Sequence, residues 1–139
     1  MTISTVTWTK QMSVGVSALD ADHQRLIDLL NVIFTACFAG VGDDYVSKTL
    51  DDLIQYTQEH FKREIDLLSA HGFPDCEDHA REHERLVTQL QEKCETARSQ
   101  LAKGISVEVM EFLRGWLVNH IMERDMVYAA YLKETGVSK

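Results

Sequence analysis

His60-Phe61-Lys62-Arg63-Glu64 and, nineteen residues after His60, His79-Ala80-Arg81-Glu82-His83 are the stretches that decide how this chain folds. Each stretch begins and ends with a side chain that can bind a metal ion. On an α-helix, residues four apart lie on one face, about one turn from each other. Each pair also falls on the apolar face of its expected helix, where an unpaired histidine or glutamate is costly to bury. A bound metal would remove that cost, so the sequence predicts helices packed around a metal centre.

Apolar residues recur at steps of three and four in four segments of the chain, which is the pattern of amphipathic helices. Glycine and proline separate these segments, because glycine favours the end of a helix and proline cannot continue one. The expected helices span about residues 19–38, 44–70, 75–102 and 106–135. Their expected caps are Ser17 or Asp20 for the first helix, Asp43 or Asp44 for the second, and Ser106 for the fourth.

Short connections between helices of this length make consecutive helices antiparallel neighbours. The sequence therefore predicts an all-α fold, an up-down-up-down antiparallel four-helix bundle, over residues 18–136. Residues 1–17 are rich in Thr, Ser and Val and are expected to form an extended N-terminal arm, anchored by Trp8, Val14 and Val16. A length of 139 residues suits one domain, so residues 1–139 are interpreted as a single domain.

The composition excludes several classes of function. The net charge of -8 argues against a nucleic-acid partner and against attraction to anionic lipid. The most apolar run, residues 29–41, is too short to span a bilayer and is interrupted by Asn31 and Thr35, so no membrane segment is expected. The three cysteines form no C-x-x-C motif, and residues 1–10 lack the apolar core of a secretory signal. These features favour the cytoplasm.

Five of the six histidines lie on apolar faces, and the sixth, His71, lies in a predicted turn. In an antiparallel bundle the starts of the first and third helices lie beside the ends of the second and fourth. The five histidines and two carboxylates should therefore converge at one end of the bundle: His23, His60, Glu64, His79, His83, His120 and Asp125. A single histidine on an apolar face is usually a core residue, but burying this many polar groups without partners would be very costly.

Asp125 follows His120 by five residues, which is roughly 140° around a continuous helix. On such a helix the two side chains would not point the same way, and both would reach one interior site only by flanking the inward face. Seven ligands exceed what one transition metal ordinarily takes from protein. Two metals that share two bridging carboxylates would use all seven. Imidazole and carboxylate without thiolate suit iron, and zinc, copper or manganese less exclusively.

The ordered motif His23, His60-x-x-x-Glu64, His79-x-x-x-His83 and His120-x-x-x-x-Asp125 resembles the pattern of the hemerythrin family, and of bacterial hemerythrins in particular. The surrounding residues agree with this resemblance over nearly the whole chain. They include Trp8, Val14-Gly15-Val16, Gly72-Phe73-Pro74 and Trp116-Leu117.

The resemblance implies a non-haem di-iron centre that binds O2 reversibly, for oxygen storage, transport or delivery. It implies that His79, His83 and His120 hold one iron and that His23 and His60 hold the other. Glu64, Asp125 and an oxo or hydroxo group would bridge the two ions. O2 would bind at the iron with two histidines, where NO or azide-like anions could also bind. A monomer is expected.

Other functions stay open: a sensor of O2, NO or redox state that uses the same centre, a di-iron enzyme that reduces O2 or NO, and a structural metal site or iron store. The expected walls of the site are apolar, which favours reversible binding over catalysis because a dry pocket hinders loss of reactive oxygen species. These walls are Ile27, Phe61, Trp116, Leu117 and Ile121. No catalytic residue is predicted, and the chain is not expected to be an enzyme.

Overall fold

The computed structural model describes residues 6–39, 42–101, 104–120 and 124–134. One short 3-10 turn precedes five α-helices, and the described residues contain no strand, which confirms the all-α prediction. The elements are η1 (Lys10–Met12), α1 (Ser17–Ala39), α2 (Asp43–Ala70), α3 (Cys76–Ser99), α4 (Val107–Asn119) and α5 (Asp125–Glu134). None of the described helices combines the length and apolarity needed to cross a bilayer.

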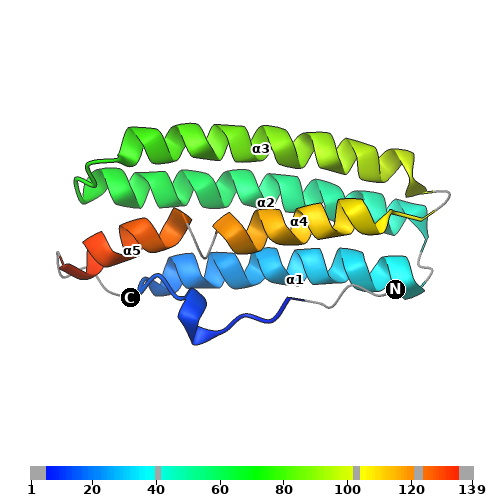
Figure 1. Ribbon diagram of the computed structural model, residues 1–139, viewed down its shortest axis with the longest axis horizontal. Coiled ribbons are helices and arrows are strands. Elements are labelled where there is room, and N and C mark those ends of the chain that lie inside the picture. The colour runs from blue at the N-terminus through cyan, green and yellow to red at the C-terminus, as the bar shows by residue number, and fades with distance from the viewer. Residues whose placement is uncertain (1–5, 40–41, 102–103, 121–123, 135–139) are drawn as a thin grey trace.

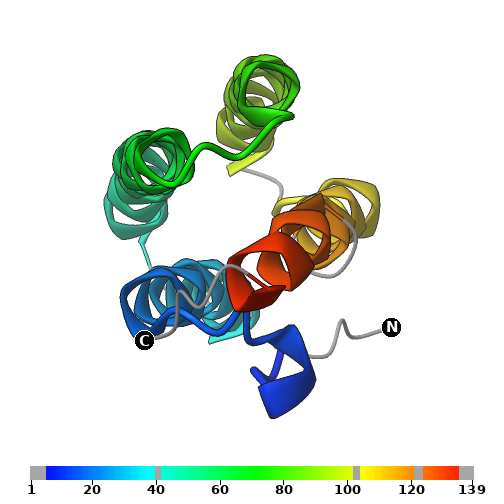
Figure 2. The same cartoon turned by 90° about the vertical axis from the view of Figure 1, so that its left-hand side faces the viewer.

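The helices form a ring of four columns whose long axes are roughly aligned (Figure 1). α4 and α5 follow one another along the fourth column, as the end view in Figure 2 shows. α1 packs against α2, α2 against α3, α3 against α4, and α4 against α1, so the ring is closed. In Figure 1 the colour runs from left to right along α1 and α3, and from right to left along α2, α4 and α5.

Two apolar clusters fill the interior. The larger joins α1, α2, α3 and α4, and its fully buried members include Ile33, Phe34, Leu50, Leu90 and Leu113. The smaller lies at the end where α2 connects to α3, and comprises Val14, Val16, Leu19, Leu68, Phe73, Tyr128 and Leu132. Along each column the buried histidines and carboxylates fall between the two clusters. Apolar packing on both sides therefore holds the bundle around a polar layer.

The described part of the N-terminal segment is held against α1. Both the backbone N–H and the backbone C=O of Val6 are hydrogen-bonded to the side chain of Asn31, at 2.8 Å each. Asp20 accepts hydrogen bonds from the backbone N–H of Val14 at 2.9 Å and from Ser13 Oγ at 2.5 Å. The turn η1 shows that this segment is not extended throughout, because residues 10–12 are helical.

Two of the predicted helix starts can be compared with the structure. Ser106 caps α4 as predicted, since its side chain accepts a hydrogen bond from the backbone N–H of Val109 at 3.3 Å. The predicted cap of the second helix is wrong: Gly42 occupies the N-cap of α2, and Asp43 and Asp44 are already inside the first turn. Their carboxylates still favour the helix there, because negative charge near a helix N-terminus is stabilising.

A left-handed glycine ends α2. Gly72 has a φ of +69°, and the backbone N–H of Phe73 donates to the C=O of Leu68 at 3.0 Å. This geometry reverses the chain and directs the Phe73 side chain into the smaller apolar cluster. Glycine is favoured at such a position because any other residue pays a steric cost for a positive φ.

Gly72→Ala is expected to lower the free energy of unfolding by about 1–2 kcal/mol. Among the described residues, a Cβ atom at this position would meet only Tyr131 Oη, at 3.9 Å, so the loss would come from the backbone and not from crowding. Urea unfolding monitored by circular dichroism measures the change. Gly115→Ala is the matched control: Gly115 lies inside α4, has room for a Cβ, and should gain up to about 1 kcal/mol. Equal shifts in both variants would contradict this account of the turn.

Candidate metal centre

The seven side chains that the sequence selected all lie together in the buried polar layer. Four are completely buried, and the most exposed, His79, has a relative exposure of only 9%. α1 supplies one of them, α2 two, α3 two, and the column of α4 and α5 the remaining two. The set is His23, His60, Glu64, His79, His83, His120 and Asp125.

Glu64 stands between two groups of histidines. Its Oε1 lies 2.7 Å from Nε2 of His79 and 2.7 Å from Nε2 of His83. Its Oε2 lies 3.1 Å from Nε2 of His60 and 3.6 Å from Nε2 of His23. One carboxylate oxygen therefore faces the histidines of α3, and the other faces the histidines of α1 and α2.

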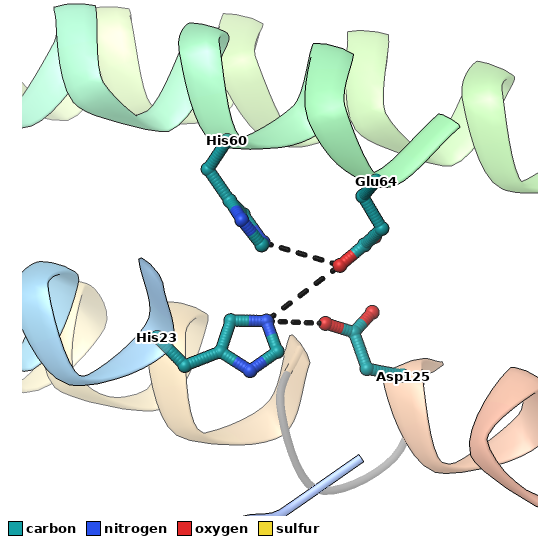
Figure 3. Close-up of side chains that lie close together, drawn as sticks. All are labelled: His23, His60, Glu64 and Asp125. Atoms are coloured by element: carbon teal, nitrogen blue, oxygen red, sulfur yellow. Dashed lines mark ion pairs between the residues drawn. The ribbon is translucent and has the colours of Figure 1, made fainter. Parts of the chain in front are cut away.

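Asp125 divides its oxygens in the same way. Its Oδ2 lies 2.8 Å from Nε2 of His23, while its Oδ1 lies 3.2 Å from Nε2 of His120 and 3.4 Å from Nε2 of His79. Figure 3 shows the first group: His60 and Glu64 extend from α2 toward His23 and Asp125, Glu64 pairs with both histidines, and Asp125 pairs with His23. The ligand atoms form two overlapping sets, and both carboxylates belong to each: His23, His60, Glu64 and Asp125, and Glu64, His79, His83 and Asp125.

The meeting of His120 and Asp125 corrects the expected continuous fourth helix. α4 ends at Asn119 and α5 begins at Asp125, so the predicted helix is interrupted. His120 and Arg124, on either side of residues outside the description, both have the wider hydrogen-bonding pattern of a π-helix. Nε2 of His120 and Oδ1 of Asp125 lie 3.2 Å apart, which the 140° separation of a regular helix would oppose. Such interruptions often occur at functional sites.

The carboxylates govern the charge of the cluster. Burial lowers the pKa of His23, but Asp125 and Glu64 outweigh this effect and raise it to about 10. The same opposition raises the pKa of His79 to about 9. Burial raises the pKa of Glu64, but the surrounding histidines hold it well below its usual value. Ionised Glu64 therefore requires positive charge beside it, and either protons on these histidines or metal cations bound to neutral imidazole can supply it.

The arrangement fits a pair of cations better than it fits a hydrogen-bond network. Both ring nitrogens of His23, His83 and His120, and both oxygens of Asp125, are buried and form no geometrically acceptable hydrogen bond with a described residue. Their contacts with neighbouring ligand atoms are nevertheless short. Two atoms bound at right angles to one cation at about 2.1 Å lie roughly 3 Å from each other. The separations of 2.7 to 3.6 Å across the cluster match that spacing.

Of the predicted wall residues, Phe61 contacts the cluster directly, and three others are buried. Phe61 stacks on the His83 ring with centroids 3.7 Å apart and planes 4° apart. Trp116 is buried and donates its indole N–H to the backbone C=O of Leu86 at 3.0 Å, and Ile27 and Leu117 are buried as well. The remaining predicted wall residue, Ile121, lies outside the described residues.

Two surface hollows reach the cluster from outside. One, of about 380 Å³, lies between α3 and α4 and is lined by Trp116 and His120. The other, of about 220 Å³, is lined by Phe73 and His79. Glu82 and Arg124 line both hollows and form an ion pair of 3.2 Å with each other. A small molecule can therefore approach the edges of two of the candidate ligands.

The sequence interpretation missed two polar residues that support the cluster, Tyr128 and Asp22. Tyr128, which was interpreted as packing, donates its O–H to Oε2 of Glu64 at 2.8 Å. Asp22 accepts a hydrogen bond from Nδ1 of His60 at 2.9 Å. Spacing could have revealed Asp22, because it falls on the apolar face of α1 between Leu19 and Leu26, where an acid needs a partner.

Comparisons with known proteins agree with this geometry. The family model described as the hemerythrin HHE cation binding domain matches residues 14–132. A bacteriohemerythrin of Stenotrophomonas maltophilia (strain R551-3) is 32% identical over 126 residues, which cover 91% of this chain and 80% of the relative. A bacteriohemerythrin of Methylococcus capsulatus (strain ATCC 33009 / NCIMB 11132 / Bath) is 30% identical over 131 residues, covering 91% and 96%. A crystal structure of wild-type hemerythrin superposes with a TM-score of 0.75 at 28% identity, covering 91% of this chain and 97% of that chain.

Proposed function

Since the chain belongs to the hemerythrin family, we propose that it binds O2 reversibly at a di-iron centre, for oxygen storage, transport or delivery. One observation carries this proposal: each of two buried carboxylates presents one oxygen to each of two histidine groups. That is the arrangement expected of ligands that bridge two metal ions. One iron would be held by His79, His83 and His120, the other by His23 and His60, with Glu64 and Asp125 shared between them.

When bound, the two iron ions supply the electrons that reversible O2 binding needs. One ion would have three histidine ligands and the other only two. The ion beside His23 and His60 would therefore keep a position for an exogenous ligand, which could also be NO or an azide-like anion. Tyr128 restrains Glu64 by donating a hydrogen bond to Oε2. Phe61, stacked on His83, would keep bulk water from that ligand. A dry, restrained site favours release of the bound molecule over further reaction.

The proposal extends to the organisation of the chain. Residues 18–136 would form one up-down-up-down bundle preceded by an N-terminal arm at residues 1–17, and residues 1–139 one hemerythrin-like domain. The alternating colour direction in Figure 1 supports this topology. We propose that the protein is a cytoplasmic monomer and an oxygen-binding protein, not an enzyme.

A visible absorption spectrum tests the function. The iron-loaded, reduced protein would be measured under argon, then in air, then again under argon. A charge-transfer band that appears in air and disappears under argon is the expected result. Irreversible conversion to a ferric spectrum would instead favour a redox sensor or an enzyme, and steady consumption of a reductant would favour the enzyme. Absence of any change would overturn the proposal.

Removal of the metal is expected to destabilise the fold. Each bound ion stabilises the native state by about 2.7 kcal/mol when free metal stands 100-fold above its dissociation constant. The loss should be large here because Glu64 and Asp125 are completely buried and would lose their cations. Thermal unfolding with iron and after chelation measures the effect. The variant His71→Ala, which changes the exposed histidine outside the cluster, should show the same metal dependence as the native chain. Equal melting temperatures with and without metal would contradict the prediction.

A further inference from the structure

Asp22 forms a compact hydrogen-bonded group behind His60, on the side away from the cluster. Its Oδ2 accepts hydrogen bonds from Nδ1 of His60 at 2.9 Å and from Nε of Arg63 at 2.9 Å. Its Oδ1 accepts from Nη2 of Arg63 at 2.8 Å and from the O–H of Tyr56 at 2.8 Å. Asp22 has a relative exposure of only 6%, so α1 contributes a buried carboxylate with four donors, all from α2.

This support distinguishes His60 from the other histidines of the cluster. The Nδ1 atoms of His23, His83 and His120 are buried without a hydrogen-bond partner among the described residues. Only at Nδ1 of His60 do the described residues place a carboxylate. Asp22 also precedes His23 directly in α1. Asp22 is therefore hydrogen-bonded to His60 and adjacent in sequence to His23, the two histidines that face Oε2 of Glu64.

The hydrogen bond to Asp22 has two consequences for His60. A proton held at Nδ1 leaves the lone pair of Nε2 free, and Nε2 is the atom that faces Glu64 at 3.1 Å. A carboxylate behind an imidazole also raises its basicity as a metal ligand. Arg63 opposes the second effect, because its guanidinium binds the same carboxylate through two hydrogen bonds and draws its negative charge away from His60.

We propose that Asp22 is a positioning residue for the metal ion bound by His60, fixing the tautomer of that histidine and strengthening its bond, and that Arg63 limits this strengthening. The inference rests on the proposed function, since it requires a metal at the cluster. The Arg63 side chain is 46% exposed, so the hydrogen bonds from Arg63 through Asp22 to His60 connect the surface with the cluster. Tyr56 contributes one neutral hydrogen bond and completes the fourth donor position of the carboxylate.

Zinc titration of the metal-free chain tests the proposal without any oxygen chemistry, because zinc is redox-inert. The native chain should take up two zinc ions. Asp22→Asn should weaken one of the two binding steps by about 10-fold or more and leave the other nearly unchanged. Arg63→Gln should tighten that same step, although it breaks the same hydrogen-bonded group. A purely structural role for the group would weaken binding in both variants.

Two further measurements separate positioning from simple electrostatics. Glu82→Gln removes the same negative charge near the cluster, because Glu82 lines a hollow with His120. Among the described residues, Glu82 is hydrogen-bonded to Arg85 and not to a histidine of the cluster, so this variant should not weaken one zinc-binding step selectively. In the zinc-loaded protein, nitrogen-15 NMR should find the proton of His60 at Nδ1, with a resonance that moves in Asp22→Asn and not in Glu82→Gln. An unchanged His60 resonance, together with equal zinc affinities, would overturn the inference. Failure of the native chain to bind two zinc ions would instead overturn the proposed metal centre.

Discussion

Glu64→Gln is expected to reduce the iron content from two ions per chain to one at most and to abolish the O2-dependent absorption band. Glu64 is completely buried and is the side chain on which both histidine groups converge. Glutamine keeps the shape of the side chain but replaces one oxygen with an NH2 group, which donates hydrogen bonds and does not ligate a cation. It also removes one of the two negative charges in the cluster, so the site would attract two cations far less strongly.

Iron analysis of the purified variant and its visible spectrum measure these effects. Glu59→Gln makes the same chemical change on the exposed side of α2 and should leave both unchanged, which separates loss of a ligand from a general effect on the helix. Circular dichroism should find Glu64→Gln still helical, because apolar clusters flank the polar layer on both sides. Two tightly bound ions and a reversible band in this variant would show that Glu64 does not bridge the metals.

Hydrophobic periodicity was sufficient for most of the fold because the helices are long and strongly amphipathic. It located α1, α2 and the start of α3 to within about two residues, the usual uncertainty of a helix end. The comparisons confirm the family resemblance that the motif suggested. The division of the last column could not be predicted in this way, because periodicity assumes a constant turn. The five-residue spacing of His120 and Asp125 was the available signal, since a regular helix would have separated them.

The proposed metal ligands were easier to select from the sequence than the residues that form hydrogen bonds with them. A histidine on an apolar face is conspicuous, and four-residue spacing links the pairs on α2 and α3. The position of Asp22 on the apolar face of α1 indicates that it needs a partner but not which one, because Arg63 lies 41 residues away on a different helix. Only packing of α1 against α2 brings them together. Tyr128 likewise shows its role only once α5 is placed beside α2.

His60→Ala is expected to abolish reversible O2 binding while leaving a folded protein. The substitution removes one of only two histidines proposed for the iron that takes O2, so that ion should be lost or bound weakly. Asp22 would lose one donor but would keep Arg63 and Tyr56 as hydrogen-bond partners, so no unpaired charge would be created. The ion proposed for His79, His83 and His120 should be affected less, because Nε2 of His79 and Nε2 of His83 contact the other oxygen of Glu64.

The measurements are iron content, which should fall to about one ion per chain, and the spectrum in air and under argon, which should no longer change. Loss of the imidazole also leaves a cavity, so the free energy of unfolding should drop by about 2–4 kcal/mol. Comparison with His83→Ala sharpens the test, since that variant removes one of three histidines and should leave the O2-binding ion in place more often than His60→Ala does. A reversible band that survives in His60→Ala would place the O2 site elsewhere and would contradict the assignment of His23 and His60 to the open iron.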